Sequence, residues 1–203
     1  MQLKIEILSY WHTGAGKSGG ATIDALVEKD DGIPYLPGRN LKGLVRDAVY
    51  CAEEWGRVPK NLTNTLFGTR AEEQGKRRHD TDSGALRFCN ATLEPALASW
   101  LKNPASYDAA ALQKHLFTTL YATRIEHDSG TAFDKSLRSI EASIPLTLYA
   151  QLDNIKPEQL TAYPDWQSNL KKCLVLMRAV GSWRNRGLGR AVVTLVENNH
   201  AAS

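Results

Sequence analysis

The sequence has few cysteines, and their spacing does not match a metal-binding or disulfide motif. Cys51, Cys89 and Cys173 are an odd number without a CxxC pair, which argues against a disulfide framework or a zinc ribbon and fits a reducing compartment. No stretch approaches the ~18 consecutive apolar residues of a membrane-spanning helix, and the alternating residues 1–7 are no signal peptide. We therefore expect a cytoplasmic protein without a membrane partner.

The sequence also lacks a complete P-loop, although Gly16-Lys17-Ser18 matches the end of one. That motif needs a glycine five residues before Gly16, where this chain has Trp11, and a helix directly afterwards. Gly19-Gly20 follows instead and disfavours a helix. We interpret this segment as a glycine-rich turn.

Acidic residues are absent from one long stretch near the C-terminus. Residues 171–190 contain six basic residues and no Asp or Glu, whereas the whole chain has 25 basic and 22 acidic residues and a net charge of only +3. The positive charge is therefore local, which is typical of a footprint for a polyanion.

The end of this stretch, residues 181–190, combines three glycines, three arginines and a tryptophan. Glycine lets the main chain turn tightly and approach a partner, and the arginine fork matches phosphate oxygens. The pattern predicts a phosphate-binding loop, with an ordinary solvated loop as the alternative. The residues that we expect to contact the phosphates of a polyanion here are Gly181, Ser182, Arg184, Asn185, Arg186, Gly187 and Arg190.

The order of predicted elements indicates an α+β fold. It runs strand, helix, strand, strand, helix, strand, which is typical of a ferredoxin-like, RNA-recognition-like domain with an antiparallel sheet and helices on one face. We expect Asn40 to cap the first helix and Gly181 to follow the second as its C′ glycine. Alternation and helical periodicity place strands at 2–9, 85–93, 144–152 and 192–196 and helices at about 40–55 and 166–180, with mostly helical connections at 95–118.

The length of 203 residues indicates one domain over 1–203. Two polar segments interrupt the element pattern: 69–84, which we interpret as a mobile loop, and 119–142, which we interpret as an inserted hairpin.

Four segments resemble, in the same order, the RAMP superfamily. They are Trp11–Gly16, Ile33–Arg46 (IPYLPGRNLKGLVR), Leu66–Gly68 and Gly181–Arg190 (GSWRNRGLGR). More narrowly, these segments resemble the backbone subunits of type III CRISPR-Cas effector complexes, and the resemblance covers most of the chain. It departs at Trp183 and Asn185, where smaller residues are common in the family.

The resemblance implies a modified RNA-recognition-like fold and a role in an antiviral ribonucleoprotein. Such subunits stack along a guide RNA, which pairs with a complementary target RNA. The expected partners are therefore both RNAs, other CRISPR effector subunits and copies of this chain. Binding to the guide is expected to depend on phosphates rather than on sequence.

The resemblance also places the target-cleaving aspartate of type III subunits at Asp24, in the segment before the IPYLPG stretch. A carboxylate there would bind Mg²⁺ or a similar divalent cation, which stabilises charge at phosphorus in endoribonuclease cleavage. The sequence shows no second carboxylate with paired spacing, so a metal site would be sparse or completed by RNA. The alternative is a non-catalytic, structural RNA-binding subunit.

A second group of RNA-binding residues is expected at the first helix. Lys42 and Arg46 lie four residues apart and share one face, and the amides at a helix start favour phosphate. Because the resemblance covers this helix, Arg39, Asn40, Lys42 and Arg46 form a predicted guide-phosphate site. The alternative is that they lie on the solvent-exposed side of an ordinary amphipathic helix.

The 119–142 segment occupies the position of the family's hairpin, which kinks the guide–target duplex. Arg124 and Lys135 are expected to contact RNA, and Ile125 and Phe133 to insert beside bases. A loop that packs against a neighbouring subunit is the alternative.

His12 supports a further alternative. RAMP-type guide-processing endonucleases often use a histidine in metal-independent cleavage, and His12 has the chemistry for that role. A chelator separates this alternative from an Asp24-dependent reaction.

Overall fold

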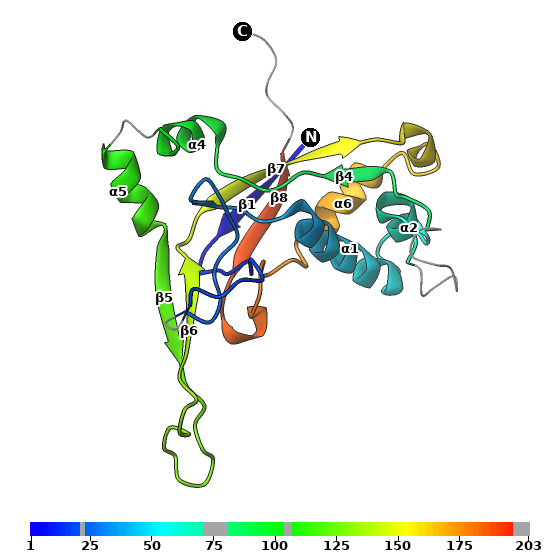
Figure 1. Cartoon of the computed structure of the whole chain (residues 1–203). Coiled ribbons are helices and arrows are strands. Elements are labelled where there is room, and N and C mark those ends of the chain that lie inside the picture. Colours follow the sequence, from blue (N-terminus) through cyan, green and yellow to red (C-terminus); the bar gives the residue numbers. More distant parts are fainter. Residues whose placement is uncertain (21–22, 71–80, 104–106, 197–203) are drawn as a thin grey trace.

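A four-stranded antiparallel sheet forms the centre of the computed structural model, which describes residues 1–20, 23–70, 81–103 and 107–196 (Figure 1). The strands lie in the order β4–β7–β1–β8. Their bounds are Gln2–Ile7 (β1), Leu86–Phe88 (β4), Thr147–Asn154 (β7) and Ala191–Val196 (β8). The central strand β1 sets Leu3 opposite Ala150 of β7 and Leu195 of β8.

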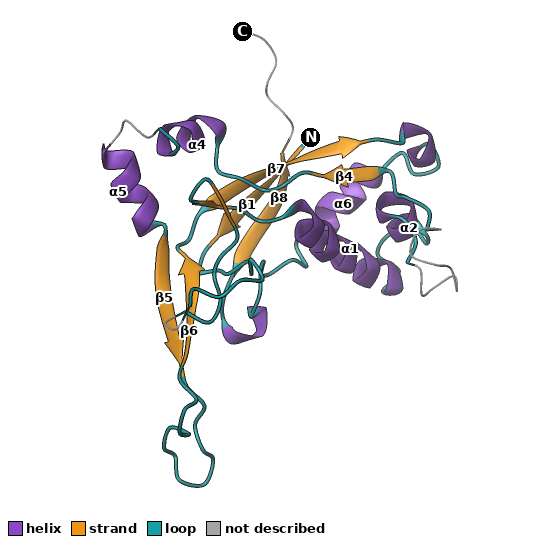
Figure 2. Ribbon diagram, viewed as in Figure 1, coloured by secondary structure: helices purple, strands orange, loops and turns teal. Residues whose placement is uncertain are grey.

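Helices cover one face of this sheet (Figure 2). The alternation in β1 buries Leu3, Ile5 and Ile7 toward them and leaves the intervening side chains more exposed. The apolar stripe of α1, which includes Leu41 and Val45, joins the same core. The covering helices are α1 (Gly38–Glu54), α2 (Leu62–Phe67) and α6 (Trp166–Leu174).

The order β1-α1-β4-β7-α6-β8 along the chain, with β1 beside β8 and β7 beside β4, is the ferredoxin-like arrangement. The predicted α+β fold, with an antiparallel sheet and helices on one face, is therefore confirmed. None of the helices in the described part of the chain is long and apolar enough to cross a membrane.

A hairpin of β5 (Phe117–Ala122) and β6 (Arg138–Ser143) projects from the body of the molecule (Figure 1). Its strands and turn include the polar segment 119–142, for which the sequence predicts an inserted hairpin, and extend slightly beyond both ends of it. Its base is joined to the N-terminal half through bridges from Trp11 to Ser143 and from Ala25 to Ile140. The remaining short elements are β2 (Lys29–Asp30), β3 (Ile33–Pro34), α4 (Pro95–Leu101), α5 (Tyr107–His115), η1 (Pro157–Leu160) and η2 (Arg184–Arg186).

The predicted cap of the first helix is wrong. The helix begins at Gly38, with Pro37 at the N-cap, so Asn40 lies inside its first turn. The Gly38 N–H donates to the side chain of Asn90 over 2.9 Å, and a Cβ on Gly38 would lie 2.4 Å from the Phe88 carbonyl. A residue distant in sequence therefore caps the helix, which begins where only glycine fits against β4.

The second helix ends at Leu174, six residues before the predicted end, so Gly181 is not its C′ residue. Residues after the helix turn back along the start of β8: Ala179 bridges Arg190, and the Val180 N–H donates to the Gly189 carbonyl over 2.8 Å. This tertiary pairing replaces further helical turns.

Two predicted strands are shifted. The segment 85–93 is regular only over Leu86–Phe88 and continues as bridges from Ala91 to Leu36 and from Thr92 to Tyr149. The strand expected at 144–152 is β7, two to three residues later. Of the loop predicted at 69–84, residues 71–80 lie outside the described residues.

Candidate nucleic-acid interface

The glycine-rich segment 181–190 is bound along residues 9–12, just beyond β1. Gly181 has φ +79°, and a Cβ there would lie 2.4 Å from the His12 carbonyl oxygen. The N–H groups of Ser182 and Gly189 donate to the carbonyls of His12 and Tyr10, each over 2.7 Å. We call residues 181–190 the arginine loop; its close approach to residues 9–12 requires glycine at position 181.

The arginine loop presents unpaired positive charge. Arg184 and Arg186 lie on η2, Arg190 follows Gly189, and all three are exposed, as is Arg178 just before the loop. Among the described residues, none of these four guanidinium groups has a hydrogen-bond or ion-pair partner. Their charge is available to an external anion, and guanidinium is the group best matched to phosphate.

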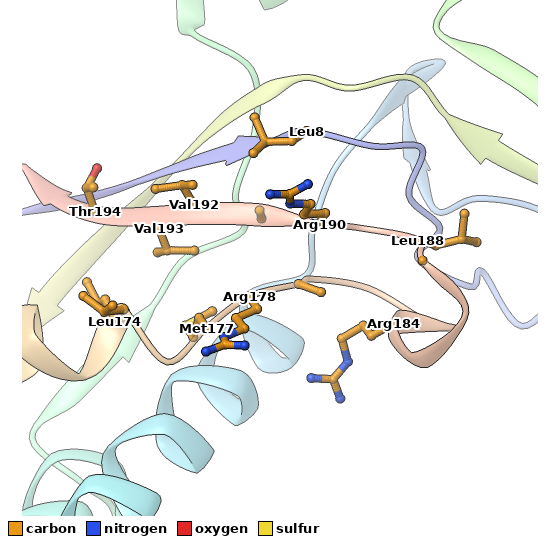
Figure 3. A pocket seen from close by; sticks show the side chains of 14 residues that line it. Leu8, Leu174, Met177, Arg178, Arg184, Leu188, Arg190, Val192, Val193 and Thr194 are labelled. Atoms are coloured by element: carbon orange, nitrogen blue, oxygen red, sulfur yellow. The ribbon is translucent and has the colours of Figure 1, made fainter.

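The arginines surround hollows in the surface. Figure 3 shows Arg178, Arg184 and Arg190 around a hollow of about 690 Å³ whose walls also include Leu8 and Val192. A second hollow, of about 450 Å³, is formed by residues 181–186 of the loop itself. Arg178 belongs to the acid-free stretch 171–190 but is absent from the predicted RNA-binding set, because its sequence context does not reveal that it shares a hollow with Arg184.

Asp24 lies in a neighbouring cleft of about 470 Å³, which Lys17, Ser182 and Trp183 also line. Its Oδ2 accepts a hydrogen bond from the Ser139 N–H over 2.7 Å, and its own N–H donates to the Ser139 carbonyl over 2.8 Å. The carboxylate is exposed, and its Oδ1 has no hydrogen-bond partner among the described residues. The base of the hairpin thus holds Asp24 while leaving one oxygen open to the cleft.

His12 lines the same cleft as Asp24. Its Nδ1 lies 2.7 Å from the Glu141 carbonyl oxygen, which can only accept, so Nδ1 is the donor of this hydrogen bond. Nε2 is on the side of Gly14, which also lines the cleft, and the ring packs against Trp183 with centroids 4.8 Å apart. Asp24 and His12, the two residues predicted as alternatives for catalysis, therefore share one cleft.

The described residues contain no group of three or more His, Cys, Asp or Glu side chains placed to hold a metal ion. Asp24 would be the single carboxylate ligand in its cleft. A Mg²⁺ ion fits such a donor set, because it commonly keeps several waters and takes one or two carboxylates together with phosphate oxygens of the substrate.

The predicted residues on α1 divide into two kinds. Arg39 and Asn40 are exposed, and the amide of Asn40 donates to the Pro37 carbonyl over 2.9 Å rather than being open to an anion. The predicted contribution of this amide is therefore wrong, since the helix begins earlier than expected. Binding of RNA by the side chains of Arg39 and Asn40 stays a prediction.

Lys42 and Arg46 are half-buried on the same helix. The Arg46 guanidinium donates to the Gly68 carbonyl over 2.8 Å and to the Asn64 side chain over 3.4 Å, which joins α1 to the C-terminal end of α2. Burial, and then the nearby charge of Arg46, lowers the pKa of Lys42. Arg46 therefore has a structural role, and contact of either residue with RNA stays a prediction.

The tip of the hairpin exposes the predicted contact residues Arg124 and Lys135. The guanidinium of Arg124 lies over the ring of Phe133, 5.2 Å from its centroid. Ile125 and Phe133 are exposed, as insertion beside bases requires. Their contact with a duplex stays a prediction.

Comparison with known proteins agrees with this architecture. The family model of the RAMP superfamily matches residues 4–192. No curated protein sequence matches the chain significantly. The structure is similar, at 11% identity and a TM-score of 0.66 over 95% of each chain, to a chain of a type III-B Cmr-beta complex solved by cryo-electron microscopy with cognate target RNA. A chain of the apo Cmr-beta complex matches at 12% identity and a TM-score of 0.61 over 97% of each chain. The family model matches nearly the whole chain, and the ferredoxin-like sheet agrees with it. The chain therefore belongs to the RAMP superfamily.

Proposed function

We propose that this protein is an RNA-binding subunit of a type III CRISPR effector complex and that it binds guide RNA through the arginine loop. The observation that carries the proposal is the group of four exposed arginines, Arg178, Arg184, Arg186 and Arg190, without partners in the described structure. Membership of the RAMP superfamily and the likeness to chains of Cmr-beta complexes, one of them bound to target RNA, support it.

The expected binding is electrostatic and independent of RNA sequence. Arginine side chains and main-chain amides of a glycine-rich loop contact phosphate oxygens, which all nucleotides share. Tyr10 and His12 hold the loop through main-chain hydrogen bonds, so little ordering is needed on binding.

The test is fluorescence anisotropy of a labelled single-stranded RNA with the full chain. We expect Arg184→Gln with Arg186→Gln to weaken binding at least tenfold. Lys171→Gln with Lys172→Gln is the matched control, because it removes the same charge from the same acid-free stretch but on the exposed side of α6. Equal losses of RNA affinity in both double variants would show that net charge alone accounts for binding and would contradict a specific role for the loop.

We further propose that Asp24 supports divalent-metal-dependent cleavage of the target RNA. Its exposed carboxylate, with Oδ1 open to the cleft beside Ser182 of the arginine loop, supports this role. Mg²⁺ held by Asp24 and phosphate oxygens would stabilise the charge that develops at phosphorus. His12, which lines the same cleft, supports the alternative of metal-independent processing of the guide RNA.

The test is cleavage of a labelled complementary RNA by the guide-loaded complex in Mg²⁺. Asp24→Asn is the sharper variant, because an amide oxygen can still accept the hydrogen bond from Ser139 while the negative charge is lost. We expect cuts that disappear both with Asp24→Asn and with chelator. Cleavage of a labelled guide precursor that survives chelator but disappears with His12→Ala would favour metal-independent guide processing instead. No cuts from the wild type would leave a structural subunit.

A further inference from the structure

We propose that a groove between α1 and the segment 176–179 binds single-stranded RNA that leaves the arginine loop, and that a base stacks on Trp55. The inference rests on the proposed RNA binding by the loop and extends it to a second, aromatic subsite. It assigns a function to Trp55, the most exposed tryptophan among the described residues. Trp55 is not one of the site residues predicted from the sequence.

The groove has a volume of about 540 Å³. One wall is a stripe of α1 in which Leu44, Ala48, Cys51 and Trp55 recur at helical spacing. The opposite wall is the chain from Leu176 to Ala179 together with Arg184 and Asn185. The groove therefore lies between one side of α1 and the chain that leads into the arginine loop.

Trp55 is the C-cap residue directly after α1, and its N–H donates to the Cys51 carbonyl over 3.1 Å, which fixes its backbone. Its side chain is nevertheless 63% exposed. In the described structure the indole contacts no other ring and makes no hydrogen bond. A large aromatic surface held at the mouth of a groove but left open to solvent is suited to stacking with a base.

The charge of the groove favours RNA as the occupant. Arg178 and Arg184 reach it from the wall opposite Trp55, and neither has an ion-pair partner among the described residues. The one acidic residue lining the groove, Asp47, is paired with Arg70 at 3.2 Å. The combination of unpaired cations and an aromatic platform is typical of single-strand binding surfaces.

Continuity with the arginine loop favours RNA over a protein partner. Arg184 and Asn185 line both the hollow of the loop and this groove, and Arg178 and Arg184 also line the hollow shown in Figure 3. A strand whose phosphates contact the loop therefore meets the groove directly. Tryptophan and arginine are also enriched in protein interfaces, so the experiment below separates the two occupants.

The experiment compares Trp55→Ala and Trp55→Phe with the wild-type full chain, using a labelled oligouridylate in anisotropy titrations. We expect Trp55→Ala to bind about 5-fold to 150-fold more weakly, since a stacked base is lost, and Trp55→Phe to stay within a few-fold of wild type. The dependence of affinity on salt should not change, because no charge is removed. Trp100→Ala is the matched control: it removes an indole, 41% exposed, from α4 at the other end of the molecule (Figure 1).

Three other outcomes are distinguishable. Wild-type affinity in Trp55→Ala, together with the loss in Arg184→Gln with Arg186→Gln, would overturn the stacking subsite and leave RNA binding by the loop intact. Wild-type affinity in both would overturn the proposed function as well. Wild-type RNA affinity in Trp55→Ala with reduced incorporation into the assembled complex would identify the groove as a protein interface and also overturn the proposal. Because Trp55 is mostly exposed, its variants should fold, and thermal denaturation verifies this.

Discussion

The N–H of Ser182 donates a hydrogen bond to the carbonyl of His12 over 2.7 Å, and this contact joins the arginine loop to the cleft of Asp24. Trp183 strengthens the junction by packing on the His12 ring. The residues proposed to bind guide phosphates and those proposed for cleavage are thus parts of one connected surface. A change at the junction should affect both.

Gly181→Ala tests this junction. The added Cβ meets the His12 carbonyl and also occupies a left-handed backbone position, which alone costs an L-residue about 1–2 kcal/mol. Gly187→Ala in the same loop carries the backbone cost but meets no atom within 4 Å. We expect the free energy of unfolding, measured in urea, to fall clearly more for Gly181→Ala than for Gly187→Ala. Equal losses would show that the loop does not depend on its contact with His12.

Arg46→Ala and Arg39→Ala should separate structure from binding on α1. Arg46 holds the Gly68 carbonyl, so its loss should lower the free energy of unfolding by about 1.5–3 kcal/mol, the usual contribution of a hydrogen bond to a charged group. Arg39 is exposed, so its loss should leave stability unchanged within about 0.5 kcal/mol and reduce RNA affinity. A stable Arg46→Ala would contradict the structural role of this side chain.

Glu141→Ala should impair cleavage more than RNA binding. The Glu141 carboxylate accepts hydrogen bonds from the Val27 N–H over 3.0 Å and from Lys29 Nζ over 2.7 Å, and so fixes the segment that carries Asp24. Its removal leaves a partly buried donor unsatisfied and should cost about 1–3 kcal/mol. The exposed Glu158 is the control residue. Cleavage at the wild-type rate in Glu141→Ala would show that Asp24 does not need this support.

Cys173 should make stability depend on pH in the alkaline range. Burial raises the pKa of its thiol from 9.0 to about 11. The folded state therefore holds the proton more tightly than the unfolded state, so this contribution is complete below pH 9 and is lost as pH rises toward 11. The free energy of unfolding should fall by up to about 1.4 kcal/mol per pH unit in that window. Cys173→Ala should remove this slope, and an unchanged slope would assign it to other groups.

Local sequence patterns were sufficient to predict the sheet and its covering helices. The alternation of Leu3, Ile5 and Ile7 and the stripe of α1 each follow from burying one face, and both are observed. Helix ends were not predictable, because Asn90 caps α1 from a distant part of the chain, and pairing of Ala179 with Arg190 ends the helical path after Leu174.

The candidate site was predictable only where one segment contains it. The arginine loop is visible in the sequence because glycine and arginine are adjacent there. The shared cleft of Asp24 and His12, the support of Asp24 by Ser139, and the groove that joins Arg178 to Trp55 depend on residues far apart in the chain. Such contacts arise from tertiary packing, which periodicity and composition do not encode.

The most direct test of the central claim is the ionic-strength dependence of RNA binding by the wild type and by Arg184→Gln with Arg186→Gln. Each phosphate contact on single-stranded RNA contributes about −0.7 to the slope of log affinity against log salt concentration. We predict a steep negative slope for the wild type and a slope shallower by about 1.4 for the double variant. Identical slopes in the two proteins would contradict phosphate binding by the arginine loop.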